Sequence, residues 1–146
     1  MYHRILIPVD GSSTSERALD EAIRMVRLHP AQVELIFVMA GIFYLNDEDL
    51  SDYTVLIDSM KRGGEEILEK AKKKLQLAGV VVDTKLIAAK GERIATVIIN
   101  EAKSYQADLI IIGTHGRSGF SHMLLGSVAE AVVRMSHIPI LLIRGH

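Results

Sequence analysis

The chain has 146 residues, of which 49% are hydrophobic and 24% are charged, and its 17 Lys and Arg against 18 Asp and Glu leave a net charge of −1. This length suits a single domain, so we take residues 1–146 as one domain. The high apolar fraction with so little net charge excludes a disordered chain. The absence of Cys excludes a disulfide scaffold, thiolate catalysis and a cysteine zinc site. The balanced charge lacks the basic excess of nucleic-acid binders, so we expect no nucleic-acid partner.

The apolar pattern also argues against a membrane protein. No segment approaches the ~18 consecutive apolar residues that a spanning helix needs. The apolar run that precedes Pro8 is too short for the core of a signal peptide. We therefore expect a cytoplasmic protein with no membrane partner.

Five short apolar runs follow one another along the chain, with helical patterns between them. The runs are continuous rather than alternating, which is typical of strands buried on both faces of a parallel sheet. We predict strands at 5–9, 33–38, 80–88, 109–112 and 140–143. Apolar stripes at helical spacing predict helices at 18–26, 67–78, 94–102 and 128–135. This alternation predicts an α/β fold in three layers, with a five-stranded, doubly wound parallel sheet.

Some connections between these elements can be interpreted locally. The Ser and Thr residues at 12–15 offer an N-cap for the first helix, and Ser13 can form a capping box with Glu16. Gly79 is the expected C-cap of the second helix. Segment 41–54 mixes aromatic and acidic residues and predicts a loop or irregular insertion. A solvated loop and a lid over a ligand site both remain open for it.

The candidate site follows from the expected topology. In an open parallel sheet, ligands bind beyond the carboxyl ends of the strands, where the strand order reverses. The first predicted strand runs into Pro8, Val9 and Asp10, and the fourth is followed by Gly113. If these two strands are neighbours, Asp10 and the glycine-rich segment that starts at Gly113 share one crevice.

The glycine-rich segment spans residues 113–128 and leads into the last helix. Its glycines stand at 113, 116, 119 and 126, and glycine lets backbone N–H groups approach a bulky anion. Gly126 and Ser127 fall where the helix begins, so free N–H groups and the positive end of the helix dipole would face the segment. From residue 113 onward Glu130 is the only acidic residue. A phosphate is the natural ligand, and the alternative is a flexible connection in which Ser127 is an ordinary N-cap.

This segment fits neither of the common phosphate motifs. A P-loop needs G-x-x-x-x-G-K-[ST], and no Lys follows Lys103. A dinucleotide motif needs G-x-G-x-x-G after the first strand, where the chain has only Gly11. The spacing here is G-x-x-G, nine residues, then G-S.

With Pro-x-Asp closing the first strand, this spacing resembles the universal stress protein family, specifically its ATP-binding branch. The resemblance covers essentially the whole chain. It rests on ILIPVDGS at 5–12, Gly91 after the third strand, DLIIIGTHGR at 108–117, LLGSVAE at 124–130 and IPILLIR at 138–144. The family resemblance implies a Rossmann-like fold of the adenine nucleotide alpha hydrolase-like kind that binds ATP with Mg²⁺ or Mn²⁺.

The resemblance also assigns roles to residues. The phosphate side would be formed by Gly113, Thr114, His115, Gly116, Arg117, Gly126, Ser127 and Val128. Asp10 is similar to the acidic residue that contacts the ribose or a water on the bound divalent cation. The four carboxylates of segment 47–52 would repel a triphosphate unless they point away or share its metal.

The nucleoside side of the resemblance lies on the first two strands. Pro8 and Val9 would border the nucleoside. Val38, with Met39, resembles the backbone edge that contacts adenine. Many relatives carry His before that Val, where this chain has Phe37. The backbone contact remains possible with Phe37.

Several other chemistries fit less well. A haloacid-dehalogenase-type phosphatase needs a nucleophilic Asp where Pro8 stands. A receiver-like phosphoacceptor needs an acidic cluster and a Lys at the strand ends, and a serine hydrolase needs a G-x-S-x-G elbow that the chain lacks. The six histidines show no metal-ligand spacing. Among them, only His115 lies where it could touch a ligand at the glycine-rich segment.

The last strand raises the question of assembly. Ile140–Ile143 would be an edge strand in this topology, and an exposed apolar edge favours pairing. Antiparallel pairing across a two-fold axis would bury it, so we expect a homodimer. The family resemblance implies the same.

Two functions from different classes are compatible with these features. The first is a nucleotide-dependent switch or sensor in stress response, with slow ATP hydrolysis or none, because no general base or Walker lysine is present. AMP or cyclic AMP could occupy the same crevice. The second is a nucleotide-free dimeric module that recruits a protein partner.

Overall fold

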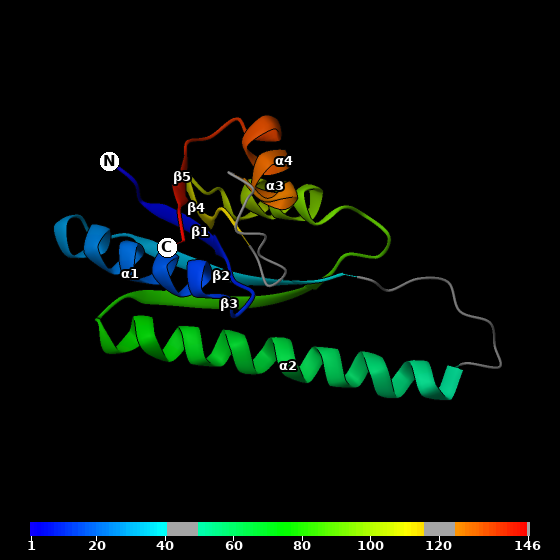
Figure 1. Cartoon of the computed structure of the whole chain (residues 1–146). Coiled ribbons are helices and arrows are strands. Elements are labelled where there is room, and N and C mark those ends of the chain that lie inside the picture. The colour runs from blue at the N-terminus through cyan, green and yellow to red at the C-terminus, as the bar shows by residue number, and fades with distance from the viewer. Residues whose placement is uncertain (41–49, 116–124, 146) are drawn as a thin grey trace.

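The computed structural model describes residues 1–40, 50–115 and 125–145, in which strands and helices alternate (Figure 1). The strands are β1 (Arg4–Pro8), β2 (Gln32–Met39), β3 (Val81–Ala88), β4 (Leu109–Gly113) and β5 (Ile140–Ile143). The helices are α1 (Ser13–Leu28), α2 (Leu50–Leu77), α3 (Ile94–Tyr105) and α4 (Ser127–Met135). Each strand boundary lies within one residue of its predicted position.

All five strands form one parallel sheet in the order β3-β2-β1-β4-β5. The order reverses between β1 and β4, which are hydrogen-bonded neighbours. The predicted doubly wound α/β fold is therefore confirmed. The condition under which Asp10 and the segment from Gly113 share one crevice, that the first and fourth strands are neighbours, is also met.

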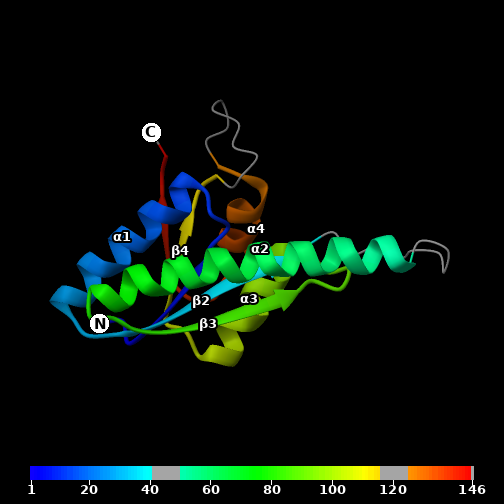
Figure 2. The same ribbon diagram turned by 90° about the horizontal axis from the view of Figure 1, so that it is seen from below.

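The helices cover the two faces of the sheet separately, which gives three layers (Figures 1 and 2). Ile5 and Ile7 of β1 point into the core under α1 and α2, while Leu6 points into the core under α3 and α4. All three side chains are at most 1% exposed. Burial on both faces is the reason that the central strands are continuously apolar.

The edge strands are less buried than the central strands. On β3 the side chains of Val81, Asp83 and Lys85 are exposed, because α2 covers only the other face of this strand. All four residues of β5 are partly buried. A continuous apolar run therefore predicts the environment of the sheet's centre better than that of its edges.

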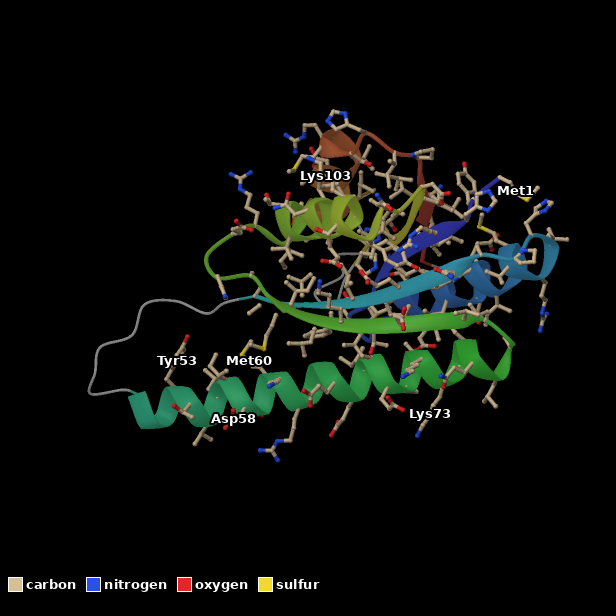
Figure 3. The ribbon with its side chains drawn as sticks, turned by 180° about the vertical axis from the view of Figure 1, so that it is seen from behind. Met1, Tyr53, Asp58, Met60, Lys73 and Lys103 are labelled. Atoms are coloured by element: carbon tan, nitrogen blue, oxygen red, sulfur yellow. The ribbon has the colours of Figure 1, made fainter. Side chains whose placement is uncertain are left out.

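Helix α2 begins earlier than the sequence predicts. It starts at Leu50, so the prediction of an irregular segment up to residue 54 is wrong for residues 50–54. Residues 41–49 lie outside the described part of the chain. Tyr53, Ile57 and Met60 extend the apolar stripe of α2 at helical spacing, and Figure 3 shows Tyr53 and Met60 on the side of the helix that faces the sheet.

The start of α1 is capped by a different serine from the one predicted. Ser12 is the N-cap, and its side chain accepts a hydrogen bond from the backbone N–H of Ser15 at 3.3 Å. A Ser13 capping box is therefore wrong, because Glu16 stands four residues after the actual cap. The Glu16 carboxylate instead lies 3.1 Å from Nζ of Lys74 on α2. This ion pair joins the two helices of one layer.

The far end of α2 agrees with the sequence prediction. Gly79 has a φ of +80°, and its N–H donates to the carbonyl of Gln76 at 2.9 Å. None of the helices in the described ranges is both long enough and apolar enough to cross a membrane.

Two adjacent glycines of α2 have different surroundings, which allows a matched test of the packing. A Cβ on Gly64 would lie 2.6 Å from Cδ1 of Phe37, whereas a Cβ on Gly63 would meet nothing within 4 Å. We expect Gly63→Ala to stabilise the protein by about 0.5–1 kcal/mol through helix propensity. Gly64→Ala should be less stable than Gly63→Ala by about 1–3 kcal/mol, a typical cost of overpacking. Urea unfolding measures both, and equal stabilities would contradict the close packing of α2 on β2.

Candidate functional site

A cavity of about 430 Å³ opens at the carboxyl ends of β1 and β4. Its volume falls within the range of small-molecule sites. It lies where the strand order reverses, as expected for an open parallel sheet. The residues that line it are Pro8, Val9, Asp10, Ser12, Thr14, Ser15, Val38, Ile94, Ile98, Ile112, Gly113, Thr114, His115, Gly126, Ser127, Val128 and Ala129.

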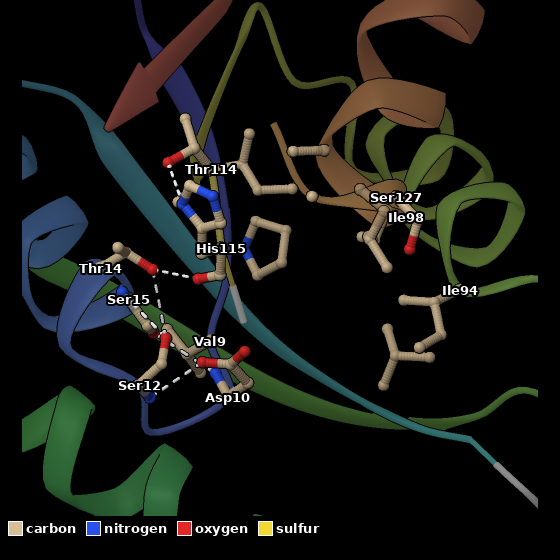
Figure 4. A pocket seen from close by; sticks show the side chains of 17 residues that line it. Val9, Asp10, Ser12, Thr14, Ser15, Ile94, Ile98, Thr114, His115 and Ser127 are labelled. Carbon is tan, nitrogen blue, oxygen red and sulfur yellow. Dashed lines mark hydrogen bonds between the residues drawn. The ribbon is translucent and has the colours of Figure 1, made fainter. Parts of the chain in front are cut away.

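One wall of the cavity is polar and is built by hydrogen bonds at the start of α1 (Figure 4). The backbone N–H of Ser12 donates to Oδ1 of Asp10 at 2.9 Å. The hydroxyl of Thr14 donates to the backbone carbonyl of His115. Ser12 Oγ lies 3.3 Å from Thr14 Oγ1, and because Thr14 uses its only hydroxyl proton on His115, Ser12 is the donor of that pair. These contacts join the β1–α1 turn to the end of β4.

The opposite wall is apolar. Val38 at the end of β2 and Ile94 and Ile98 on α3 line it. Figure 4 shows Ile94 and Ile98 across the cavity from Asp10, Ser12 and Thr14. An apolar slot that faces polar groups suits a ligand with one flat apolar part and one polar part.

The start of α4 closes the third side of the cavity. The N–H of Gly126 donates to the carbonyl of Thr114 at 2.6 Å, and a Cβ at position 126 would lie only 2.7 Å from that oxygen. Glycine is therefore required for this close approach. The first N–H groups of a helix have no acceptor within it, and here they belong to cavity-lining residues, Ser127 and Val128 among them. They and the helix dipole provide a place for an anion.

The described lining carries little formal charge. It contains no Lys or Arg, and its titratable side chains are Asp10 and His115. Nδ1 of His115 lies 2.9 Å from Oγ1 of Thr114. An anion in the described part of the cavity would therefore be held by N–H groups, hydroxyls and any cation that it brings with it.

Asp10 is the residue that could hold such a cation. Its Oδ1 accepts from Ser12, and Oδ2 has no hydrogen-bond partner among the described residues. No cluster of three or more His, Cys, Asp or Glu exists within the described ranges. Mg²⁺ is often held by one carboxylate, phosphate oxygens and water, so the residues present fit a metal that arrives with a nucleotide.

Most of the predicted site residues that the structure describes lie around this one cavity. These are Pro8, Val9, Asp10, Val38, Gly113, Thr114, His115, Gly126, Ser127 and Val128. Gly116 and Arg117 lie outside the described part of the chain. Met39 is not brought to the cavity, because its side chain is buried elsewhere and its carbonyl accepts from the N–H of Ala89 at 2.9 Å.

The structure also adds lining residues that the sequence analysis missed: Ser12, Thr14, Ser15, Ile94, Ile98, Ile112 and Ala129. The Ser and Thr residues beside Asp10 were interpreted only as helix caps. Their position directly after the first strand was the signal that could have placed them in the site. The α3 residues gave no such signal, because their apolar stripe is that of any core helix.

Phe37, which stands where many relatives carry His, does not face the cavity. Its ring packs on the α2 side of the sheet beside Gly64, while the next residue, Val38, points to the opposite side and lines the cavity. Alternation along β2 thus separates the substitution from the site.

Comparison with known proteins agrees with this architecture. The chain matches the universal stress protein family over residues 1–144. It belongs to that family. Universal stress protein YxiE of Bacillus subtilis is 33% identical over 154 residues, with 99% of this chain and 100% of the relative covered. Universal stress protein MJ0531 of Methanocaldococcus jannaschii is 33% identical over 144 residues, with 99% and 83% covered.

Two solved structures of the family are informative. Protein MJ0577 of M. jannaschii superposes with a TM-score of 0.86 at 27% identity, and the match covers 100% of this chain and 98% of that one. The universal stress protein of Archaeoglobus fulgidus, solved in complex with dAMP, has a TM-score of 0.70 at 25% identity over 97% of this chain and 98% of that one. The α/β fold of this chain is therefore the fold of its family.

The hydroxyl of Thr14 provides a test of the polar wall. Thr14 is 4% exposed, so Thr14→Val would leave the His115 carbonyl without its donor in a buried place. We expect a loss of about 1–3 kcal/mol in the free energy of unfolding. Thr14→Ser keeps the hydroxyl and should lose less than Thr14→Val, about 0.8 kcal/mol at most for the one buried methyl group. Urea unfolding of both variants measures this, and a Val variant as stable as the Ser variant would contradict the hydrogen bond.

Proposed function

We propose that the cavity binds an adenine nucleotide, namely ATP with Mg²⁺ or Mn²⁺, and that the nucleotide acts as a switch or sensor ligand in a stress response. The observation that carries this proposal is that one cavity combines an apolar slot with the free N–H groups of a helix start. The dAMP complex of the A. fulgidus relative supports the same class of ligand.

In this proposal, each part of the nucleotide contacts a different part of the cavity lining. Adenine fits the slot between Val38, Ile94 and Ile98, and the phosphates fit the N–H groups at Ser127 and Val128. The ribose then lies near Asp10, between these two ends. The family resemblance assigns Gly116 and Arg117 to the phosphate side as well, and we retain them in the proposed site.

A divalent cation would offset the phosphate charge in the described part of the site. The residues that would hold it are Asp10, through Oδ2 or a water, together with the phosphate oxygens of the nucleotide. When bound, it would neutralise negative charge that no described Lys or Arg at the cavity neutralises.

We also propose that hydrolysis is slow or absent. Efficient phosphoryl transfer needs a group that orients water and a cation that stabilises charge on the transferred phosphate. The described lining offers Asp10 and His115 as titratable groups and no fixed positive charge. A nucleotide that stays intact is suited to report its own concentration through binding.

Two serines at the first positions of helices give a matched test. Ser127 is exposed at the cavity, whereas Ser13 is exposed on α1 and does not line it. We expect Ser127→Ala to weaken ATP binding about tenfold, the loss of one hydrogen bond to a charged group. Adenosine, which lacks phosphates, should bind Ser127→Ala and wild type equally. Isothermal titration calorimetry with both ligands measures this.

The control variant Ser13→Ala should bind both ligands as the wild type does. Equal loss for ATP and adenosine in Ser127→Ala would place the phosphates elsewhere. If neither ligand binds the wild type, the nucleotide proposal fails, and the nucleotide-free module that recruits a protein partner becomes the better description.

We further propose a homodimer through β5. This strand is the last in the sheet and is only partly buried. The neighbouring helix α4 exposes Val133 and Met135. Antiparallel pairing of two β5 strands would satisfy the free backbone groups of both edges.

Sedimentation equilibrium tests the dimer. We expect twice the chain mass of 16.1 kDa for the wild type. Leu141→Lys on β5 should shift the protein to the monomer mass, because a charged side chain at the interface opposes edge pairing. Val81→Lys on the opposite edge should leave the dimer intact. A wild-type monomer, or a dimer in Leu141→Lys, would refute pairing through this strand.

A further inference from the structure

A buried carboxyl pair lies outside the cavity, between β2 and α3. Glu34 on β2 is 9% exposed and Glu101 on α3 is 8% exposed. Lys85 of β3 contacts both carboxylate oxygens of Glu101, at 3.0 and 3.2 Å. Oε1 of Glu34 is buried and has no hydrogen-bond partner among the described residues. Lys85 thus pairs with Glu101, and no hydrogen bond from a cation satisfies Oε1 of Glu34.

This arrangement favours a neutral Glu34. Burial raises the pKa of Glu34, and the neighbouring Glu101 raises it further, while Lys85 lowers it; the resulting pKa is about 7. Lys85 donates its hydrogen bonds to Glu101, so Glu34 is the acid of the pair whose protonated form the surroundings favour. A protonated Glu34 can then act as a donor to its neighbour.

In the described part of the chain, no Lys or Arg forms an ion pair with Glu34. The charged and titratable groups on the elements packed around it are Arg4 of β1, Asp83 and Lys85 of β3, and Glu101 and Tyr105 of α3. Asp83 stands opposite Glu34 in the sheet register. The guanidinium of Arg4 lies over the ring of Tyr105, 4.2 Å from its centre, and donates to the Tyr105 carbonyl at 2.7 Å. Arg4 is therefore already engaged by Tyr105.

The carboxyl pair and the cavity lie at two ends of one contact between elements. On β2, Glu34, Ile36 and Val38 alternate onto the same face of the sheet, and Val38 lines the cavity. Ile36 is fully buried between them. One strand face thus runs from the acid to the ligand site.

Helix α3 faces this strand, and along it the cavity residues come before the acidic residue. Ile94, Ile98, Glu101 and Tyr105 follow at spacings of three and four, so they share one side of α3. Ile94 and Ile98 line the cavity, and Glu101 meets Glu34. The carboxyl pair and the apolar wall of the cavity therefore belong to the same contact between α3 and β2.

We propose that Glu34 and Glu101 form a proton-dependent contact that holds α3 on β2 and thereby regulates the ligand affinity of the cavity. With Glu34 protonated, its O–H donates to the Glu101 carboxylate, and the pair with Lys85 is electrically neutral. With Glu34 ionised, two buried carboxylates face one ammonium and repel each other. The regulation of ligand affinity rests on the proposed nucleotide function, whereas the contact itself does not.

The direction of the effect follows from the pKa of Glu34. It is raised from the ordinary 4.5 to about 7 in the folded protein. The stability that Glu34 contributes is therefore fully present below about pH 4.5 and is lost as the pH rises through about 7. The contact of α3 with β2 should loosen on the alkaline side of neutrality. By linkage, a ligand that needs α3 in place binds more tightly at low pH.

Amide hydrogen exchange of α3 tests the contact without any ligand. Glu34→Gln mimics the protonated acid, and Glu69→Gln on the exposed side of α2 is the matched control. At pH 8 we expect α3 amides to exchange about fivefold faster in the wild type and in Glu69→Gln than in Glu34→Gln; at pH 6 the three should agree. Because the variants are compared with one another at the same pH, the effect of pH on the intrinsic exchange rate cancels.

Equal α3 exchange in wild type and Glu34→Gln at pH 8 would overturn the proposal. Glu101→Gln is the second variant, since it also removes one of the two acids. It should slow α3 exchange at pH 8 relative to the wild type, provided that it unfolds cooperatively in urea. Faster exchange in a cooperatively folded Glu101→Gln would also overturn the proposal.

ATP titrations at pH 6 and pH 8 test the regulation. We expect the wild-type affinity to fall about fivefold more than that of Glu34→Gln between these pH values, a coupling at the lower end of the usual range. The phosphate groups of ATP titrate identically in both experiments, so the difference belongs to the protein. If the ATP affinities of the wild type and Glu34→Gln change equally with pH, the proposed regulation is wrong. No ATP binding to either protein overturns the proposed nucleotide function, and the α3 exchange still decides on the contact.

Discussion

The pairing of β1 with β4 is the constraint on which the rest of the structure depends. The chain leaves these two neighbouring strands toward opposite faces of the sheet, so no crossover covers the space beyond their ends. That space is the cavity. The turn after β1 brings Thr14 to the His115 carbonyl at the end of β4, although the two residues are far apart in sequence. Burial of Leu6 and Ile110 on the α3 and α4 side keeps this pairing fixed.

The cavity shows how a surface whose described lining has no Lys or Arg can suit an anionic ligand. Backbone N–H groups at the start of α4 belong to its described lining, and their positions depend on the contact between Gly126 and Thr114. Groups fixed by the backbone keep the same charge at all pH values. Glu34, at the remote end of the same helix contact, does titrate near neutrality. Under the two proposals, anion binding at the start of α4 and the response to protons at Glu34 would lie in different parts of the molecule.

Some of this structure could be predicted from the sequence, and some could not. The central strands were predictable because burial on both faces requires continuous apolar residues, and Asp10 was predictable because it ends such a strand. The first turns of α2 were not, because segment 41–54 mixes aromatic and acidic residues, and Gly63 and Gly64 interrupt the helical pattern before residue 67. The close packing at Gly64 is visible only once Phe37 lies against it. Met39 was assigned to the site with Val38 as part of a backbone edge, but its carbonyl accepts from Ala89 and the residue does not line the cavity. In the sequence, Glu34 is a single acidic residue within an apolar run. Its neighbours Lys85 and Glu101 come from distant segments, so the sequence did not predict this cluster.

The polar character of β3 bears on how large an assembly this fold can build. A sheet has two edges, and in this chain they are β3 and β5. If copies joined through both, the sheets would add end to end into a filament. Exposed Asp83 and Lys85 on β3 oppose the approach of another strand, whereas β5 carries only Ile and Leu. Growth by edge pairing would therefore stop after two chains, and the finished particle would present two β3 strands, one at each outer end.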